Sequence, residues 1–386
     1  MVVFRLRTKI EVIIALLMMI VVATITAVSV TRTITDTGDS VETFIRNSNG
    51  NYWSVSEANI QAAINDLGAS GWKNGIVWIP GDKEILINTG IVLKKYVTLD
   101  LQGSYLDVRS NVDGVTMAEG SVLRGGTIDT RNYAGTYTKA AVAFNPATVG
   151  HDYWTGNTRV QNMFLLGALN EGSGIQYQLA ATGDIAFATT CSDIYIHQFK
   201  YGILIDVTGG SESTMTYANG NLFNNIFMIY PQYAIYINRN TAVSHNHCDC
   251  DGNQFDNVQI QTGSNTMRAI YAEGRYNNFD NIFVWDWSGS GQQYAFEFPS
   301  DSQYQFLTYH IDANTGVESN NRYISNGTSN YRQDLRNGEY AMKTFSQASE
   351  PDIPTNTMAY WIDTDAGPKY YIIQDFNGTQ KKAELI

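Results

Sequence analysis

One phrase recurs three times in the middle of the chain and decides the fold: Asn221-Leu222-Phe223-Asn224-Asn225-Ile226, Asn253-Gln254-Phe255-Asp256-Asn257-Val258 and Asn277-Asn278-Phe279-Asp280-Asn281-Ile282. The copies begin 32 residues apart (221 to 253) and 24 residues apart (253 to 277), which is the spacing of one supersecondary unit. A second phrase alternates with the first, at Tyr201–Ile205, Tyr233–Ile237, Arg268–Ala272 and Tyr294–Phe298. Each repeat therefore carries two short strands.

The alternation of apolar and polar residues in these phrases predicts strands with one buried side, and no amphipathic stretch of helical length separates them. We therefore expect an all-β parallel β-helix, in which stacked coils place identical side chains above one another at about 4.8 Å. Asn suits the corners of such coils because it tolerates the left-handed conformation and its amide can bond the next coil. An antiparallel β-sandwich rich in Asn turns is the competing fold, but it gives no reason for the ordered recurrence.

The composition agrees with an elongated solenoid built from one large core. The chain has 386 residues, of which 44% are hydrophobic and only 16% charged, and a solenoid can use that length as a single domain. The formal net charge of −12 disfavours nucleic acid as a partner, because phosphate binding needs a basic surface. Three cysteines are too few for a disulfide scaffold.

The N-terminus predicts a membrane segment. Arg5, Arg7 and Lys9 precede the uncharged stretch Val12–Val30, which approaches the ~20 residues that span a bilayer as a helix. Basic residues before the span predict a retained anchor with the body of the protein extracellular. Cleavage as a signal peptide near Ser29, and a type IV pilin-like segment at Glu11, are the alternatives.

The predicted organisation has four parts. Residues 1–31 form the signal anchor or signal peptide, residues 32–54 a linker, residues 55–344 the parallel β-helix, and residues 345–386 a small C-terminal β module. Within the third part, the apolar spacing after Ser56 predicts a capped amphipathic helix up to Leu67. This helix would cover the edge of the first coil. The C-terminal module is expected to serve docking or oligomerisation, for example as a homotrimer.

Three segments resemble pectate-lyase-like right-handed parallel β-helix proteins, a superfamily that includes polygalacturonases, epimerases and viral tailspikes. They are Ala62-Ala63-Ile64, Gly75-Ile76-Val77-Trp78-Ile79-Pro80-Gly81 and Gly125-Gly126-Thr127-Ile128-Asp129. The resemblance spans residues 55 to about 320 and implies a single-stranded right-handed solenoid. It does not imply one activity, since the superfamily contains lyases, hydrolases, epimerases and binding proteins. The Tyr that usually follows the Pro-Gly turn is absent, as are the paired-Asp and Arg-x-Lys segments of polygalacturonases.

The strand phase predicts a pair of outward carboxylates. Aligning the second phrase places Asp206, Asn238 and Glu273 in one column, with the two carboxylates two coils apart, or about 9–10 Å. Inverting glycosidases separate their carboxylates by roughly 6.5–9.5 Å. Asp206 and Glu273 are therefore the candidate catalytic residues. The competing interpretation is that these are ordinary polar residues facing water.

Aromatic and basic residues near that column are candidate substrate ligands. Tyr236 and Tyr271 could stack on sugar rings beside Asn238, and Arg239 or Arg275 could hold the carboxylate of an acidic sugar. Trp285 and Trp287 are further candidates for the lining of a glycan groove.

The loop from His245 to Asn253 has the densest set of metal-ligand residues. His245, His247, Cys248 and Cys250 are candidate zinc ligands, and the Asp249-to-Asn253 segment resembles the start of a calcium loop. Both patterns are incomplete, so a metal-free loop is the competing interpretation, and no cofactor is required.

These observations together predict an extracellular, membrane-tethered β-helix that binds a polysaccharide or cell-surface glycan. Whether it also cleaves the glycan as a hydrolase or a lyase is left open. The alternative is a non-catalytic cell-surface or viral tailspike-like structural adhesion protein.

Overall fold

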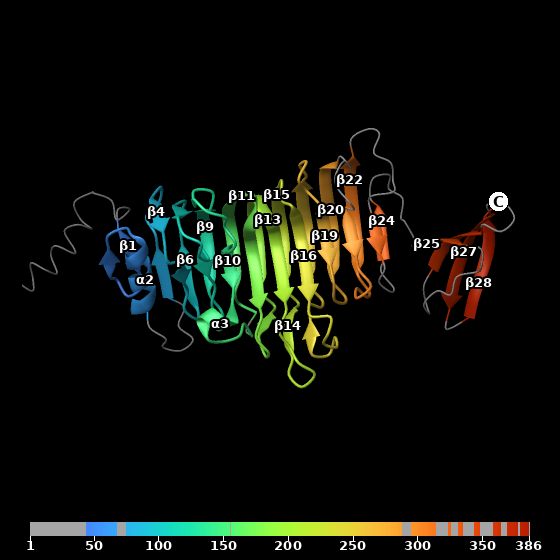
Figure 1. Cartoon of the computed structure of the whole chain (residues 1–386), viewed down its shortest axis with the longest axis horizontal. Coiled ribbons are helices and arrows are strands. Elements are labelled where there is room, and N and C mark those ends of the chain that lie inside the picture. The colour runs from blue at the N-terminus through green and yellow to red at the C-terminus, as the bar shows by residue number, and fades with distance from the viewer. Residues whose placement is uncertain are drawn as a thin grey trace, which may run out of the picture.

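The computed structural model shows a long stack of parallel strands followed by a small separate sheet (Figure 1). It describes residues 44–67, 75–154, 156–287, 295–313, 323–325, 331–334, 343–347, 358–363, 369–376 and 379–385. The main sheet has 21 strands, a second sheet consists of β12, β14 and β17, and a third consists of β25, β26, β27 and β28.

The elements of the first half are β1 (Ile45–Asn47), β2 (Tyr52–Trp53), α2 (Glu57–Asp66), β3 (Gly75–Trp78), β4 (Glu84–Ile87), β5 (Ile91–Val92), β6 (Val97–Asp100), β7 (Tyr105–Val108), β8 (Val115–Thr116), β9 (Val122–Asp129), β10 (Ala140–Phe144), α3 (Pro146–Val149), β11 (Arg159–Leu179), β12 (Ile185–Phe187) and β13 (Thr190–Val207). Those of the second half are β14 (Thr216–Asn219), β15 (Leu222–Ile229), β16 (Tyr233–Arg239), β17 (Cys248–Asp249), β18 (Gln254–Gln261), β19 (Arg268–Ala272), β20 (Asn278–Trp287), β21 (Phe296–Phe298), β22 (Phe306–Ala313), β23 (Tyr323–Ser325), β24 (Tyr331–Asp334), β25 (Lys343–Gln347), β26 (Met358–Asp363), β27 (Lys369–Phe376) and β28 (Thr379–Leu385).

Successive coils pair in parallel along separate series of strands. One series runs β3, β6, β9, β11, β13, β15, β18, β20, β22 and β24, and another runs β10, β11, β13, β16, β19, β21 and β23. Strands β11 and β13 are long enough to belong to both series. This stacking is compatible with a β-helix solenoid.

The recurring Asn and Phe residues form buried ladders, as the repeat predicts. Asn221 donates its amide to Asn253 Oδ1 at 2.9 Å, and Asn253 donates to Asn277 Oδ1 at 3.1 Å. Two positions further along, the ring of Phe255 lies parallel to that of Phe223 at 4.6 Å and to that of Phe279 at 5.0 Å. All six side chains are fully buried.

A second Asn ladder lies at the corner of the coils. Asn225, Asn257 and Asn281 have φ angles of 55°, 52° and 54°, which is the left-handed region that Asn tolerates better than most residues. Their amides bond one another, with Asn257 Nδ2 3.2 Å from Asn225 Oδ1 and Asn281 Nδ2 3.3 Å from Asn257 Oδ1. The expectation that Asn supports the corners is confirmed.

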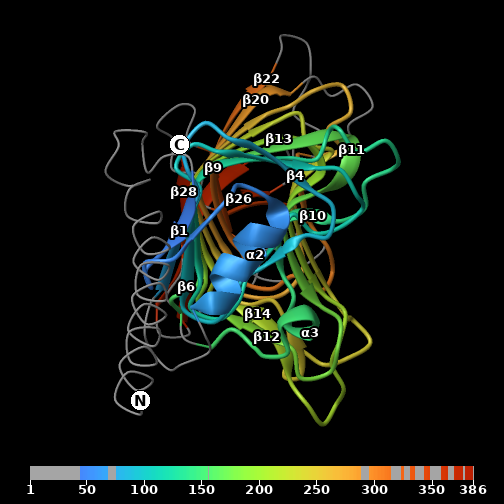
Figure 2. The ribbon, with the colours of Figure 1, turned by 90° about the vertical axis from the view of Figure 1, so that its left-hand side faces the viewer.

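Helix α2 covers the first coils, as Figure 2 shows in a view along the stack. Ser56 is its N-cap and accepts from the Asn59 N–H. Gln61 provides hydrogen-bond partners for the backbone of the edge strand β5, because its amide donates to Val92 O at 3.0 Å and accepts from Val92 N at 2.9 Å. Glu57 accepts the backbone N–H groups of residues 88, 89 and 90. The predicted cap is confirmed.

The predicted fold class needs one correction, which concerns the transmembrane helix. No helix in the described part of the chain is long and apolar enough to cross a bilayer. The stretch Val12–Val30, on which that prediction rested, lies outside the described residues. The fold class is therefore corrected to a predominantly β protein with a long parallel sheet.

A small sheet of four strands lies in the C-terminal segment, whose division as a separate module stays a prediction. β26, β27 and β28 pair antiparallel in order, and β25 joins β26 in parallel. These strands lie between Lys343 and Leu385, close to the predicted boundaries 345–386. Its role in docking or oligomerisation stays a prediction.

Phe255→Ala tests the core ladder. Removing a ring that is stacked on both sides leaves a cavity, so we expect the free energy of unfolding to fall by about 3–5 kcal/mol. Phe164→Ala is the matched control, because its ring is 53% exposed and its loss should cost less than about 1 kcal/mol. Urea denaturation measures both, and equal losses would contradict the ladder.

Candidate functional site

The predicted column of outward polar residues is present in part. Asp206 and Asn238 are in register on β13 and β16, and Asn238 Nδ2 donates to Asp206 Oδ1 at 2.8 Å. Both side chains are half-buried. Asp206 is therefore held by its neighbour in the ladder.

Glu273, the other predicted catalytic carboxylate, is only 7% exposed. Its Oε2 accepts the Arg239 backbone N–H at 2.8 Å, and its Oε1 accepts the Tyr271 hydroxyl at 2.9 Å. Burial raises the pKa of Glu273 above its ordinary value. The carboxylate thus bridges two coils and does not lie free beside Asp206, contrary to its expected outward position.

The two tyrosines predicted to bind sugar lie against each other. The rings of Tyr236 and Tyr271 are stacked at 4.5 Å with an interplanar angle of 9°. Tyr236 also lies 5.3 Å from Tyr201 and 5.2 Å from Tyr233. Each ring keeps a partly exposed surface, but their mutual contact leaves less ring face for a ligand.

The two arginines predicted to bind a sugar carboxylate form intramolecular ion pairs instead. Arg239 is 5% exposed, pairs with Asp301, and donates through Nη1 to the carbonyl oxygens of Val243 at 2.8 Å and Cys248 at 2.9 Å. Arg275 pairs with Asp251 at 2.8 Å. Both side chains therefore hold the 240–251 loop in place.

The structure does not gather the predicted zinc ligands. Cys248 and Cys250 are fully buried, and their thiols donate to Val207 O and Glu273 O. Burial raises the pKa of both thiols, which disfavours the thiolate that zinc needs. His247 Nδ1 lies 3.3 Å from Glu212, and His245 Nε2 lies 3.4 Å from Asp301.

No cluster of three or more His, Cys, Asp or Glu side chains suitable for a metal ion occurs among the described residues. The Asp249-to-Asn253 segment, which resembles the start of a calcium loop, likewise forms no such cluster in the part of the chain that the structure describes. The geometry is that of a loop held by ion pairs and core thiols.

The two predicted tryptophans lie on opposite sides of β20. Trp287 is fully buried, whereas Trp285 is 39% exposed. Of the two, Trp285 is therefore the one placed to touch a ligand, and it belongs to a surface that the sequence did not predict.

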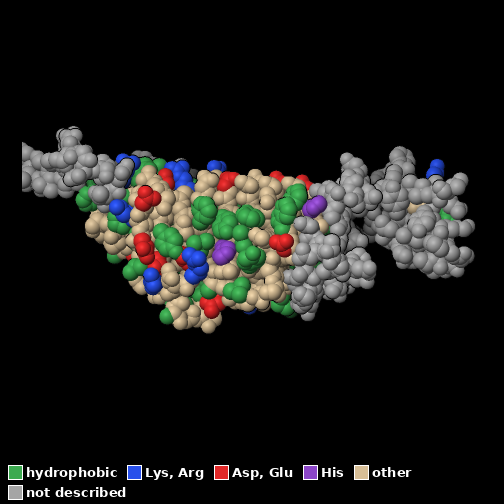
Figure 3. All heavy atoms as spheres, turned by 90° about the horizontal axis from the view of Figure 1, so that it is seen from above, with side chains coloured by type: hydrophobic (Ala, Val, Ile, Leu, Met, Phe, Trp, Pro, Cys, Tyr) green, Lys and Arg blue, Asp and Glu red, His purple; other side chains and the backbone are tan. Residues whose placement is uncertain are grey.

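That surface is a row of outward side chains on adjacent strands. The pairing of β11, β13, β15, β18, β20 and β22 aligns Phe164, Tyr195, Phe227, Gln259, Phe283 and His310. Neighbouring rings touch, with centroids 5.6 Å apart for Phe164 and Tyr195, 5.7 Å for Tyr195 and Phe227, and 5.4 Å for Phe283 and His310. Hydrophobic side chains gather on one face of the solenoid with a histidine among them (Figure 3).

A second row lies two residues further along the same strands, formed by Leu166, His197, Ile229, Gln261 and Trp285. His197 stacks beside Tyr195, and Trp285 beside Phe283. Burial and the positive charge of Arg131 lower the pKa of His197, so its imidazole is uncharged at neutral pH. We call these two rows the aromatic face.

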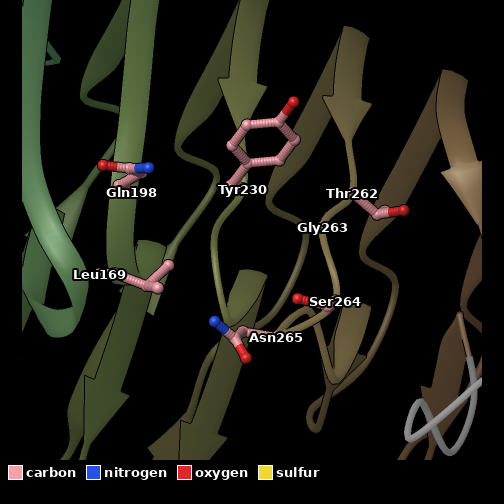
Figure 4. Close-up of a pocket in the computed structure, with 7 residues that line it drawn as sticks. All are labelled: Leu169, Gln198, Tyr230, Thr262, Gly263, Ser264 and Asn265. Atoms are coloured by element: carbon pink, nitrogen blue, oxygen red, sulfur yellow. The ribbon is translucent and has the colours of Figure 1, made fainter.

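A pocket of about 380 Å³ lies where the coils turn beyond the second row. It is lined by Leu169, Gln198, Tyr230, Thr262, Gly263, Ser264 and Asn265 (Figure 4). Gln198, Tyr230 and Thr262 each follow a residue of the second row directly in the chain. We call this space the corner pocket.

Comparison of the chain with protein families, with curated proteins and with solved structures found no match. The resemblance to pectate-lyase-like proteins therefore rests on the sequence phrases and on the stacked parallel strands alone.

A signal for the aromatic face was present in the repeat itself. Phe227, Gln259 and Phe283 each come two residues after the corner Asn of the recurring phrase. This outward position varies more between the copies than the buried Asn and Phe do, because the second copy has Gln259 where the others have Phe. The corner pocket had no such signal, because its lining comes from four separate turns of irregular length.

Asp249→Asn tests the buried charge in the 240–251 loop. Burial, with the negative charge of Asp251, raises the pKa of Asp249 from 3.8 to about 6, and Oδ1 has no hydrogen-bond partner among the described residues. Below pH 3.8 Asp249 is protonated in both the folded and the unfolded state, so the stability that comes from the neutral side chain is fully present. This stability is lost as the pH rises through about 6, where Asp249 ionises in the folded protein. At pH 7.5 the variant should be more stable by at most about 3 kcal/mol.

Thermal or urea unfolding between pH 3.5 and 8 measures this difference. The gain should shrink as pH falls and vanish below about pH 4. Asp256→Asn is the control, since Asp256 is exposed and its variant should follow the wild type. A pH-independent effect of Asp249→Asn would contradict the assignment.

Proposed function

We propose that this protein is an extracellular polysaccharide-binding solenoid that holds a glycan chain against the aromatic face. The observation that carries the proposal is the row of outward aromatic rings on successive coils. Membership of the pectate-lyase-like superfamily is part of the proposal, supported by the phrases at Gly75–Gly81 and Gly125–Asp129 and by the stacked strands.

Exposed aromatic rings suit a carbohydrate because one side of a sugar ring is formed by C–H groups, while its edge carries hydroxyls. Phe164 is 53% exposed and Trp285 39% exposed, so both lose contact with water when a sugar covers them. The row contains two groups of touching rings, separated by Gln259, and contiguous apolar patches on a protein surface commonly mark binding sites.

A rigid row also suits an extended polymer. The rings are carried by hydrogen-bonded strands, so they are held in position before the ligand arrives and binding costs little ordering of the protein. The acidic chain, with a net charge of −12, does not attract polyanions, which favours an uncharged ligand on this face.

Cleavage is not part of the proposal. A general acid must reach the glycosidic oxygen, whereas Glu273 is buried and accepts two hydrogen bonds from the protein. The interactions of Asp206 and Glu273 are those of residues that join coils. The proposal shares one feature with the alternative of a structural adhesion protein: the protein binds a glycan and does not cleave it.

Alanine variants of the aromatic face test the proposal. Each of Phe164→Ala and Trp285→Ala should weaken binding to a glycan by roughly fivefold, or about 1 kcal/mol, because a stacking surface is lost. The double variant should lose roughly 25-fold if the sites are independent. Affinity electrophoresis on a panel of polysaccharides, followed by calorimetry with those that bind, measures these changes.

Phe187→Ala is the matched control, because Phe187 is a 42% exposed phenylalanine on β12, which belongs to a different sheet. Its affinity should equal that of the wild type. Two results would contradict the proposal: binding that is unaffected by Phe164→Ala and Trp285→Ala, or release of reducing ends by the wild type that Glu273→Gln abolishes.

A further inference from the structure

We propose that the corner pocket receives an uncharged sugar unit of the glycan on the aromatic face, so that the protein selects neutral glycans over those made of uronic acids. This inference rests on the proposed function and adds its substrate class.

The pocket is continuous with the aromatic face. Gln198 follows His197, Tyr230 follows Ile229 and Thr262 follows Gln261, so three coils pass directly from the second row into the pocket lining. The ring centroids of His197 and Tyr230 are 6.4 Å apart. A chain lying on the second row can therefore place a unit or a branch in the pocket.

The lining offers unused hydrogen-bonding groups. The side chains of Gln198, Ser264 and Asn265 make no hydrogen bond to any other described residue. Amides and hydroxyls both donate and accept, as sugar hydroxyls do. The ring of Tyr230, which is 36% exposed, and the side chain of Leu169, which is 43% exposed, supply the apolar surface.

The lining also lacks any charge. None of the seven residues around the pocket is Arg, Lys, Asp or Glu. A uronate placed there would lose hydration with no cation to pair with, in a protein that is itself strongly acidic. A hydroxymethyl group would meet amides and hydroxyls instead.

The backbone at the pocket contains two residues in the left-handed region. Gln198 and Tyr230 have φ angles of 62° and 53°, and these left-handed conformations are strained for residues other than Gly, Asn and Asp. The neighbouring Gly263 lies so close to Tyr230 that an added Cβ would come within 3.0 Å of its ring. Gly263 therefore leaves no room for a larger residue beside the Tyr230 ring, which lines the pocket.

The size of the pocket fits a small part of a polymer. Its volume of about 380 Å³ is near the lower end of the roughly 300–1,000 Å³ typical of ligand pockets. The rest of the glycan would remain on the open aromatic face.

The test compares pairs of polysaccharides that differ only in charge. Each neutral polysaccharide that binds is compared with the same polymer after oxidation of its C6 hydroxymethyl groups to carboxylates. The wild type should bind the neutral form at least roughly tenfold more tightly, because a carboxylate that exchanges water for an uncharged lining gains no cation in return. The preference should persist at 1 M salt, where a Debye length of about 3 Å removes long-range repulsion.

Asn265→Lys adds a cation at the exposed rim of the pocket. It should weaken binding of the neutral polymer and strengthen binding of the oxidised one by roughly tenfold, because a charge-assisted bond becomes available. Thr208→Lys is the matched control, since Thr208 is exposed, directly follows the last residue of β13 and does not line the pocket. It adds the same charge and should leave the preference unchanged.

Three results are distinguishable from the expected one. If the oxidised polymer binds as tightly as the neutral one at 1 M salt, or if Asn265→Lys and Thr208→Lys behave alike, the pocket does not select charge and this inference fails while glycan binding stands. If no polymer of either kind binds, the proposed function fails and the inference fails with it.

Discussion

Parallel hydrogen bonding between successive coils holds each residue above the residue of the same phase in the coil below, and the rest of the structure depends on this register. A shift of one residue would exchange the buried and exposed sides of a strand. The register places Phe223, Phe255 and Phe279 in one stack inside the solenoid. The same pairing places Tyr195 and Phe227 together outside it. The same register therefore positions both the core and the candidate binding surface.

Asn side chains make that register compatible with tight corners. Stacked coils leave polar backbone groups at each turn, and buried groups of this kind need partners. Asn253 meets this need inside the core, where its amide donates to the carbonyl oxygens of Ala218 and Cys250 at 2.9 and 3.0 Å. At the outer corner, Asn257 accepts the left-handed conformation and bonds its neighbours. The phrase recurs because each coil has buried polar backbone groups that need partners and a corner that needs the left-handed conformation.

The 240–251 loop shows how residues with catalytic chemistry can serve the fold. Arg239 and Arg275 form ion pairs with Asp301 and Asp251, and Glu273 accepts a backbone N–H from the preceding coil. Removing one partner of such a set would leave a buried charge uncompensated. The acidic and basic groups predicted for chemistry therefore hold a long loop against the stack.

The sequence by itself determined the stacked parallel strands, the inward Asn and Phe ladders and the cap over the first coil, because each follows from local spacing that repeats along the chain. It placed Asp206 and Asn238 correctly in one column but could not show that Glu273 and Arg239 turn inward, since their partners lie up to 62 residues away. Only the tertiary structure decided where the aromatic face and the corner pocket lie. The corner pocket forms from turns of unequal length in four coils, and its shape depends on how those turns pack and not on any spacing in the chain.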